Sequence, residues 1–137
     1  MTKIKAVIDT NIFVRALIGS PANERIYTAF ASNGFRLFLS KEMLEELVSV
    51  LSRPRLGIAF EDIKALLHLI KLKAIIIEAT AAIKACRDPS DDMILKTAIS
   101  AKANVIVTND NDLLVLNPFQ NVSIVNPHQF LKMLKMI

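Results

Sequence analysis

Several residue types are scarce in this sequence, and each shortage excludes a class of protein. A single cysteine, Cys86, excludes an internal disulfide and a cysteine-based zinc site, and we expect it to be a small core residue. Only three glycines occur, so neither a glycine-rich Walker loop nor a dinucleotide-binding fingerprint is present. The scarcity of glycine therefore excludes functions in which a glycine-rich loop binds a phosphate group.

Long apolar runs are also absent. No stretch approaches the roughly 18 apolar residues that cross a bilayer, and the first residues lead into a short apolar run rather than a signal peptide. We therefore expect a cytoplasmic protein without membrane attachment. The chain has 137 residues, 53% of them hydrophobic, and no linker, repeat or low-complexity segment, so we expect a single domain over residues 1–137.

Charge is distributed unevenly along the chain. The formal net charge is +4, yet seven of the thirteen acidic residues gather in four short stretches. These seven are Asp9, Glu46, Asp88, Asp91, Asp92, Asp110 and Asp112. The rest of the surface is thus more basic than the total indicates, which suits a protein that holds a polyanion with lysine and arginine. Mild basicity is nevertheless common among proteins that bind no nucleic acid.

Apolar runs and amphipathic stretches alternate along the sequence. Short apolar runs typical of buried strands are found at Ile4–Ile8, Phe35–Leu39, Ala74–Glu78, Asn104–Val107 and Val122–Val125. Helical stretches are found at Asn11–Ile18, Ala22–Ser32, 41–52, Glu61–Lys73, Asp91–Lys102 and 127–135. This alternation predicts an α/β fold with a central, doubly wound parallel sheet.

Two acidic residues follow predicted strands. Asp9 comes directly after Ile4–Ile8, and Asp110 lies shortly after Val107. Ligands of such sheets bind beyond the carboxyl ends of the strands, so we expect both acids at one site. Carboxylates that converge repel one another unless a divalent cation joins them, and oxygen ligands suit Mg²⁺ or Mn²⁺. The alternative for Asp9 is a purely structural role as a helix N-cap.

Helical geometry selects among the remaining acids. Glu46 lies at the margin of the apolar stripe of its helix, whereas Glu42 and Glu45 point further toward solvent. Asp91 lies on the apolar side of its helix, and Asp92 is turned about 100° away from it. Asp92 is then either an outer metal ligand or a favourable charge at a helix N-terminus.

Neighbouring polar residues are candidates for supporting roles. Asp88 is expected to be a turn residue or a helix cap. Asp112 either caps the turn that follows it or supports the metal. Thr108 ends its strand at the same edge, where its hydroxyl can bind a carboxylate or a phosphate oxygen. Ser40 occupies the equivalent place after the second strand, although a role as an N-cap is enough to explain it.

Other catalytic arrangements find little support. His68 and His128 have no cysteine or serine partner at a nucleophile turn. Asn11 stands where a phosphatase motif of the Asp-x-Asp type needs its second aspartate. A small-molecule phosphohydrolase therefore lacks a nucleophile motif, and a metal-dependent enzyme acting on phosphodiesters is the leading interpretation.

Four stretches, in this order, resemble a PIN domain: Ala6–Phe13, the helix after Ser40, Asp88–Asp92 and Val107–Leu114. The resemblance extends from Ile4 to about Ile124 and is nearest to prokaryotic toxins of toxin–antitoxin pairs of the VapC type. It implies a three-layer α/β/α sandwich with a central parallel sheet, and Mg²⁺- or Mn²⁺-dependent endoribonuclease activity. By motif position, the catalytic and metal-binding quartet falls on Asp9, Glu46, Asp91 and Asp110.

The resemblance also implies supporting residues and partners. Asn11 and Thr108 are the supporting polar residues by motif position. RNA is the expected substrate, an antitoxin protein the expected inhibitor, and a homodimer the expected assembly. Arg53 and Arg55, after the Glu46 helix, are candidates for binding RNA phosphates, although solvated loop charges explain them as well. The alternative is a catalytically silent PIN-like module that binds RNA or protein, against which the complete acidic quartet argues.

Overall fold

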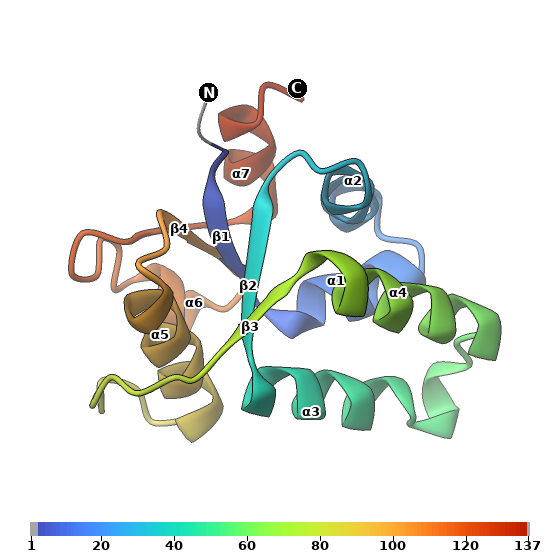
Figure 1. Cartoon of the computed structure of the whole chain (residues 1–137), viewed down its shortest axis with the longest axis horizontal. Helices are drawn as coiled ribbons and strands as arrows, with labels where there is room; N and C mark the ends of the chain where they lie inside the picture. Colours follow the sequence, from blue (N-terminus) through green and yellow to red (C-terminus); the bar gives the residue numbers. More distant parts are fainter. Residues whose placement is uncertain (1–2, 137) are drawn as a thin grey trace.

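The computed structural model describes residues 3–136 and arranges them around one parallel sheet (Figure 1). Residues 1, 2 and 137 of the predicted domain lie outside the described residues. The strands pair in the order β3-β2-β1-β4-β5, and each pairing is parallel. They are β1 (Lys5–Ile8), β2 (Arg36–Ser40), β3 (Ile75–Ile77), β4 (Val105–Val107) and β5 (Ser123–Val125). The predicted doubly wound parallel sheet is confirmed.

Helices occupy the connections between the strands. They are α1 (Thr10–Leu17), α2 (Pro21–Ala31), α3 (Lys41–Leu51), α4 (Phe60–Lys73), α5 (Pro89–Ala101), α6 (Asn111–Leu114) and α7 (Pro127–Met133), with the 3-10 turn η1 (Pro54–Leu56). The predicted helices begin and end within two residues of these bounds. The sequence did not predict α6 or η1, because one turn is too short to show an apolar period.

The helices cover both faces of the sheet. Figure 1 shows α1 to α4 on one side of the strands and α5 and α6 on the other. Right-handed crossovers explain this arrangement, because the chain moves outward from β1 to β3 and then returns through α5 to the opposite half of the sheet. The predicted three-layer α/β/α sandwich is confirmed. No helix among the described residues has both the length and the apolarity to span a bilayer.

The core fixes the two central strands and the first helix. The apolar residues of β1 and β4 are fully buried. Four rings, Phe13, Phe30, Phe35 and Phe130, follow one another with centroid separations of 6.0, 6.2 and 5.0 Å. Such aromatic contacts join α1 and α2 to the start of β2 and to α7. The N-terminus of α1, next to Asp9, is therefore held on a rigid base.

Candidate active site

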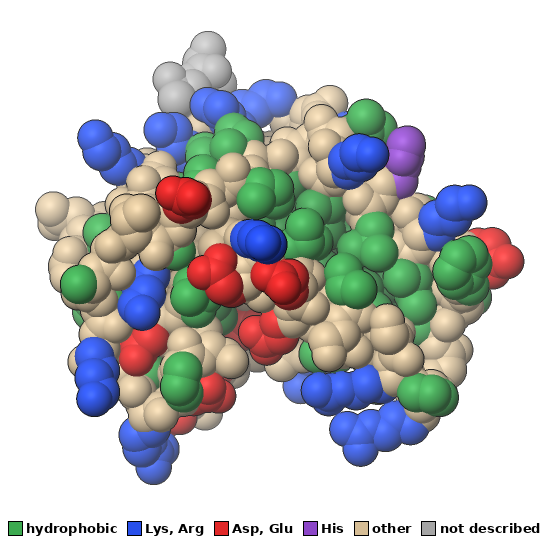
Figure 2. All heavy atoms as spheres, turned by 60° about the horizontal axis from the view of Figure 1, so that its bottom comes forward, with side chains coloured by type: hydrophobic (Ala, Val, Ile, Leu, Met, Phe, Trp, Pro, Cys, Tyr) green, Lys and Arg blue, Asp and Glu red, His purple; other side chains and the backbone are tan. Residues whose placement is uncertain are grey.

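A pocket of about 270 Å³ lies at the carboxyl ends of the central strands. The strands β1 and β4 are neighbours there, and the chain leads from β1 to one half of the sheet and from β4 to the other. Such a switch point is the usual ligand site of a doubly wound sheet. Five acidic side chains line the pocket: Asp9, Glu46, Asp88, Asp91 and Asp110. Figure 2 shows acidic side chains gathered near the centre of this face, with most Lys and Arg side chains around its edge.

Asp9 follows the last residue of β1. Its Oδ1 accepts a hydrogen bond from the backbone N–H of Asn11 at 3.2 Å, which caps α1, and its Oδ2 accepts one from the Thr108 hydroxyl at 2.9 Å. Burial raises the pKa of Asp9, as does Asp110, while these two hydrogen bonds and the charge of Arg15 lower it. Asp9 is thus the N-cap of α1, and the same carboxylate also lines the pocket.

Thr108 links the ends of β1 and β4. Its side chain is fully buried, and its hydroxyl donates to Asp9 while accepting from the backbone N–H of Asp110 at 3.0 Å. The single hydroxyl proton is therefore committed to Asp9, and the lone pairs face the Asp110 amide. The prediction that this hydroxyl binds a carboxylate is confirmed.

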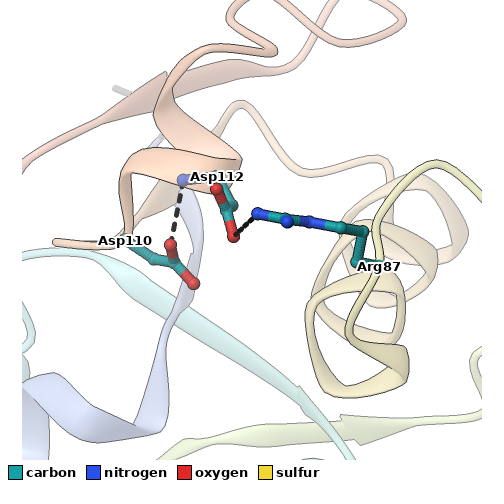
Figure 3. A network of polar contacts seen from close by, with 3 residues as sticks. All are labelled: Arg87, Asp110 and Asp112. Carbon is teal, nitrogen blue, oxygen red and sulfur yellow. Dashed lines mark hydrogen bonds and ion pairs between the residues drawn. The ribbon is translucent and has the colours of Figure 1, made fainter.

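Asp110 caps the short helix α6. Its Oδ1 accepts from the backbone N–H of Asp112 at 2.9 Å (Figure 3). The suggestion that Asp112 caps this turn is therefore wrong. The Asp112 carboxylate instead pairs with Arg87 at 3.5 Å. Carboxylate oxygens of Asp91, Asp110 and Asp112 all lie within 4.8 Å of one another, so these three can reach a single ion.

Asp91 lies in the first turn of α5. The preceding Asp88 caps this helix by accepting from the backbone N–H of Ser90 at 2.9 Å, as predicted for a cap. Burial, together with the charges of Asp110 and Asp88, raises the pKa of Asp91 to about 7. A carboxyl group with this pKa is about half protonated at neutral pH. Burial and the neighbouring acids therefore disfavour the ionised form of Asp91, and a bound cation would favour it.

Glu46 approaches the pocket from the opposite helix layer, on α3. Burial and the charges of Asp9 and Asp88 raise the pKa of Glu46, and the charge of Arg53 lowers it. Glu42, Glu45 and Glu46 are all exposed, but of the three it is Glu46 that lines this pocket. The choice made by helical geometry therefore agrees with the placement of these side chains.

Asp92 does not line the pocket. It is buried, and its Oδ1 accepts from the backbone N–H groups of Ala85 and Cys86 at 2.9 and 2.8 Å. The Ala85 and Cys86 hydrogen bonds lower the pKa of Asp92 against the opposing effect of burial. Asp92 lies in the first turn of α5, as the helix N-terminus alternative predicted, and its carboxylate also holds the segment before α5. Cys86 itself is half-buried rather than a core residue, and burial raises its pKa to about 11.

The other polar candidates divide between the pocket and its surroundings. Asn11 is exposed and lines the pocket. Ser40 is fully buried outside it, where its hydroxyl accepts from the backbone N–H of Met43 at 3.3 Å and caps α3. Arg53, the N-cap of η1, and Arg55, within η1, are exposed and do not line the pocket.

Sequence reasoning missed Arg15, which lines the pocket from the last turn of α1. The helical period could have identified Arg15 from the sequence, because it follows Asn11 by four residues and residues at this spacing share one face of a helix. Once Asn11 is placed at the site, Arg15 follows by helical geometry.

The lining is suited to a hard divalent cation. Within residues 3–136, the acidic groups of the pocket offer oxygen ligands, and no histidine or cysteine lines it. Three of these acids, Asp9, Asp88 and Asp110, are N-caps of α1, α5 and α6. Helix N-termini carry partial positive charge that offsets part of the repulsion. The raised pKa values of Asp9, Glu46 and Asp91 indicate that the offset is incomplete, and Mg²⁺ or Mn²⁺ fits this donor set.

Comparisons with known proteins agree with this architecture. Residues 5–112 match the PIN domain family. An uncharacterised protein of Methanocaldococcus jannaschii is 33% identical over 119 residues, which cover 83% of this chain and 76% of that protein. Among solved structures, a chain of VapBC2 from Rickettsia felis, bound to a DNA fragment from its promoter, has a TM-score of 0.59. That likeness covers 90% of this chain and 98% of the other at 19% identity, so it concerns the fold.

Proposed function

The chain belongs to the PIN domain family, and we propose that it is an endoribonuclease that uses Mg²⁺ or Mn²⁺ to hydrolyse phosphodiester bonds in RNA. One observation carries the proposal. Asp9, Glu46, Asp91 and Asp110 come from four separate elements and line a single pocket at the switch point of the sheet. Burial and mutual repulsion raise the pKa values of three of them, so the group is unfavourable without a cation.

Each residue has a role in the proposed reaction. A bound divalent ion supplies Lewis acidity, which lowers the pKa of water and offsets charge on the phosphate. Asp91, Asp110 and Asp112 have carboxylate oxygens close enough together to hold one ion. Asp9 and Glu46 line the same pocket and would complete its coordination or hold a second ion. The proposed role of Thr108 is to keep the Asp9 carboxylate oriented toward the pocket through its hydrogen bond.

The substrate is held by residues around these acids. Asn11 offers an amide beside Asp9 for a polar contact with the RNA. Arg53 and Arg55 lie exposed after α3, the helix that carries Glu46, and are proposed to contact backbone phosphates outside the pocket.

Cleavage of a mixed RNA pool tests this function. The wild-type protein is expected to cut RNA with Mg²⁺ or Mn²⁺ and to stop when EDTA is added, with the new ends identified by sequencing. Asp9→Asn keeps the shape of the side chain but removes its charge, and it should abolish cleavage. Asp62→Asn, an exposed change on α4, is the matched control and should cut normally.

The outcomes separate the candidate functions. Full activity of Asp9→Asn contradicts the assignment of this pocket. RNA binding without any cutting, together with a thermal midpoint that Mg²⁺ does not change, supports the silent binding module instead.

We also propose that the protein is the toxin of a toxin–antitoxin pair, that it acts in the cytoplasm and that it forms a homodimer. The family and the likeness to a chain of the VapBC2 complex support this partner class. Expression of the protein alone should arrest growth, and co-expression of a small DNA-binding protein encoded beside it should restore growth. Sedimentation of the purified protein tests the dimer.

A further inference from the structure

Arg15 is the one basic side chain that lines the acidic pocket within residues 3–136. It lies one helical turn after Asn11, and both side chains are exposed on the same face of α1. The opposite face of α1 is buried through Ile12, Phe13 and Val14. The helix is therefore a fixed support that presents an amide and a guanidinium to the pocket.

The Arg15 guanidinium has no partner in the described part of the chain. The ion pair found there joins Arg87 to Asp112. The arginine side-chain hydrogen bond found there joins Arg25 to the carbonyl of Met136. A guanidinium that lines a pocket with five carboxylates, yet pairs with none, keeps its N–H donors available for a ligand.

Its charge nevertheless acts within the pocket. The pKa of Asp9 is raised chiefly by burial, and the charge of Arg15 is among the effects that lower it. Arg15 and Asp9 line the same pocket, so a group bound beside that carboxylate is bound in the pocket that Arg15 also lines. Five carboxylates carry more negative charge than two divalent ions offset, so an entering phosphodiester still meets repulsion that a further cation relieves.

We propose that Arg15 binds the scissile phosphate of the RNA strand and positions it beside Asp9. This inference rests on the ribonuclease function proposed above. The planar guanidinium presents two parallel N–H groups that match two phosphate oxygens, whereas a lysine ammonium offers a point charge.

A structural role predicts a different set of results. A cation in the last turn of a helix is stabilised by the helix dipole, and α1 carries Arg15 in that turn. On that basis Arg15→Lys should behave as the wild type, and Arg15→Gln should lower thermal stability without changing the kinetics of the folded protein.

Cleavage kinetics distinguish the two roles. The probe is a fluorescent single-stranded RNA, with Mg²⁺ present, and the variants are Arg15→Gln, Arg15→Lys and the control Lys64→Gln. Lys64 is exposed on α4 outside the pocket. Lys64→Gln therefore removes one positive charge, as Arg15→Gln does, but at a distance from the proposed site. We expect kcat/KM to fall about 10- to 100-fold in Arg15→Gln, as for the loss of a charge-assisted hydrogen bond, and to be intermediate in Arg15→Lys. Lys64→Gln should stay within twofold of the wild type.

Binding of the same RNA gives a second measurement that does not require cleavage. Fluorescence anisotropy with Mg²⁺ compares Asp9→Asn with the double variant Asp9→Asn and Arg15→Gln, and the double variant should bind at least about tenfold more weakly. Equal affinities, or kinetics of Arg15→Gln within twofold of the wild type, overturn the role of Arg15. If the wild type cuts no RNA, the proposed ribonuclease function fails, and the anisotropy comparison still decides whether Arg15 binds the strand.

Discussion

Asp91 is an acid at a position where ionisation is unfavourable. Burial and the charges of Asp110 and Asp88 raise its pKa to about 7, so the carboxylate form costs free energy in the folded protein without metal. A divalent ion removes this cost, because it attracts the charge that the neighbouring acids repel. The same residue is therefore expected to lower stability without metal and to support activity with it.

The substitution Asp91→Asn tests whether this carboxylate lowers stability without metal and supports activity with metal. Removing the charge should raise the thermal midpoint of the metal-free protein, abolish RNA cleavage and reduce the shift that Mg²⁺ causes. Solvent at the open side of the pocket screens the repulsion, so we expect about 1 kcal/mol, or roughly 3–4 °C. Differential scanning fluorimetry with EDTA and with Mg²⁺ measures both shifts. Glu45→Gln is the control, because Glu45 is exposed and does not line the pocket.

Thr108 and Thr97 form a matched pair of fully buried threonines. The Thr108 hydroxyl bridges Asp9 and the Asp110 amide, whereas the Thr97 hydroxyl donates to the carbonyl of Met93 in its own helix. We expect Thr108→Val to cost about 1–3 kcal/mol, because it leaves polar groups unpaired, and Thr97→Val to cost less. Urea unfolding measures both changes. If the two variants unfold alike, the bridge does not hold the ends of the strands.

At the scale of elements, the segment 78–88 between β3 and α5 depends on side chains for its position. Ser100 accepts from the backbone N–H groups of residues 80 and 81, at 3.1 and 3.2 Å. Asp92 accepts from those of residues 85 and 86. Both acceptors belong to α5, so side-chain hydrogen bonds hold the segment against that helix at two points. The segment ends at Asp88, the N-cap of α5.

Amide hydrogen exchange tests the hydrogen bonds to Asp92 and to Ser100 separately. Asp92→Ala should speed exchange of the amides at 85 and 86, because their acceptor is removed, and leave those at 80 and 81 nearly unchanged. Ser100→Ala should give the reverse pattern. Mass spectrometry or NMR resolves the two sites. Equal acceleration at both sites in either variant would show that the segment opens as one unit.

At the scale of the whole molecule, the sheet brings distant parts of the chain together. Thr108 and Asp9 are 99 residues apart in sequence, yet they form a hydrogen bond because β1 and β4 are neighbours. Glu46 reaches the same pocket from the other helix layer, and Asp91 reaches it from α5. The acidic charge of the pocket is therefore a property of the assembled layers, and so is its dependence on pH.

The stability of the metal-free protein should rise as the pH falls from 8 toward 5. Folding raises the pKa values of Asp9, Glu46 and Asp91, so the folded state binds more protons than the unfolded state in this range. The gain begins near the pKa of about 7 of Asp91 and is complete below its ordinary value of 3.8. Thermal midpoints in EDTA measure it. With saturating Mg²⁺ the trend should reverse, because bound carboxylates must be ionised.

Several features of the site were predictable because they depend on local pattern. The choice of Glu46 over Glu42 and Glu45 follows from the apolar stripe of its helix, and the separation of Asp91 from Asp92 follows from a rotation of 100° per residue. Asp9 and Asp110 follow strands, so a parallel sheet places them at one edge. Each of these depends on a period or a junction that the sequence displays.

Other features depend on contacts between distant segments. Asp92 makes its hydrogen bonds with the segment 78–88, and only the tertiary structure shows that this segment packs against α5. The ion pair between Arg87 and Asp112, and the assignment of the α6 cap to Asp110, depend on a turn too short to show a pattern. Arg15 was missed because an exposed arginine in a sequence is indistinguishable from a solvated surface charge. Its place in the site became evident once the structure located α1 beside the pocket.

The sequence alone determined the alternation of strands and helices, and with it the parallel sheet and the edge at which the acids collect. These features depend on continuous apolar runs and on the 3.6-residue period of amphipathic helices, which the sequence displays. Tertiary structure alone decided which oxygen atoms meet, which hydrogen bonds the buried Asp92 makes and which carboxyl groups have a raised pKa. These quantities depend on distance and burial between segments far apart in the chain, and no local pattern encodes them.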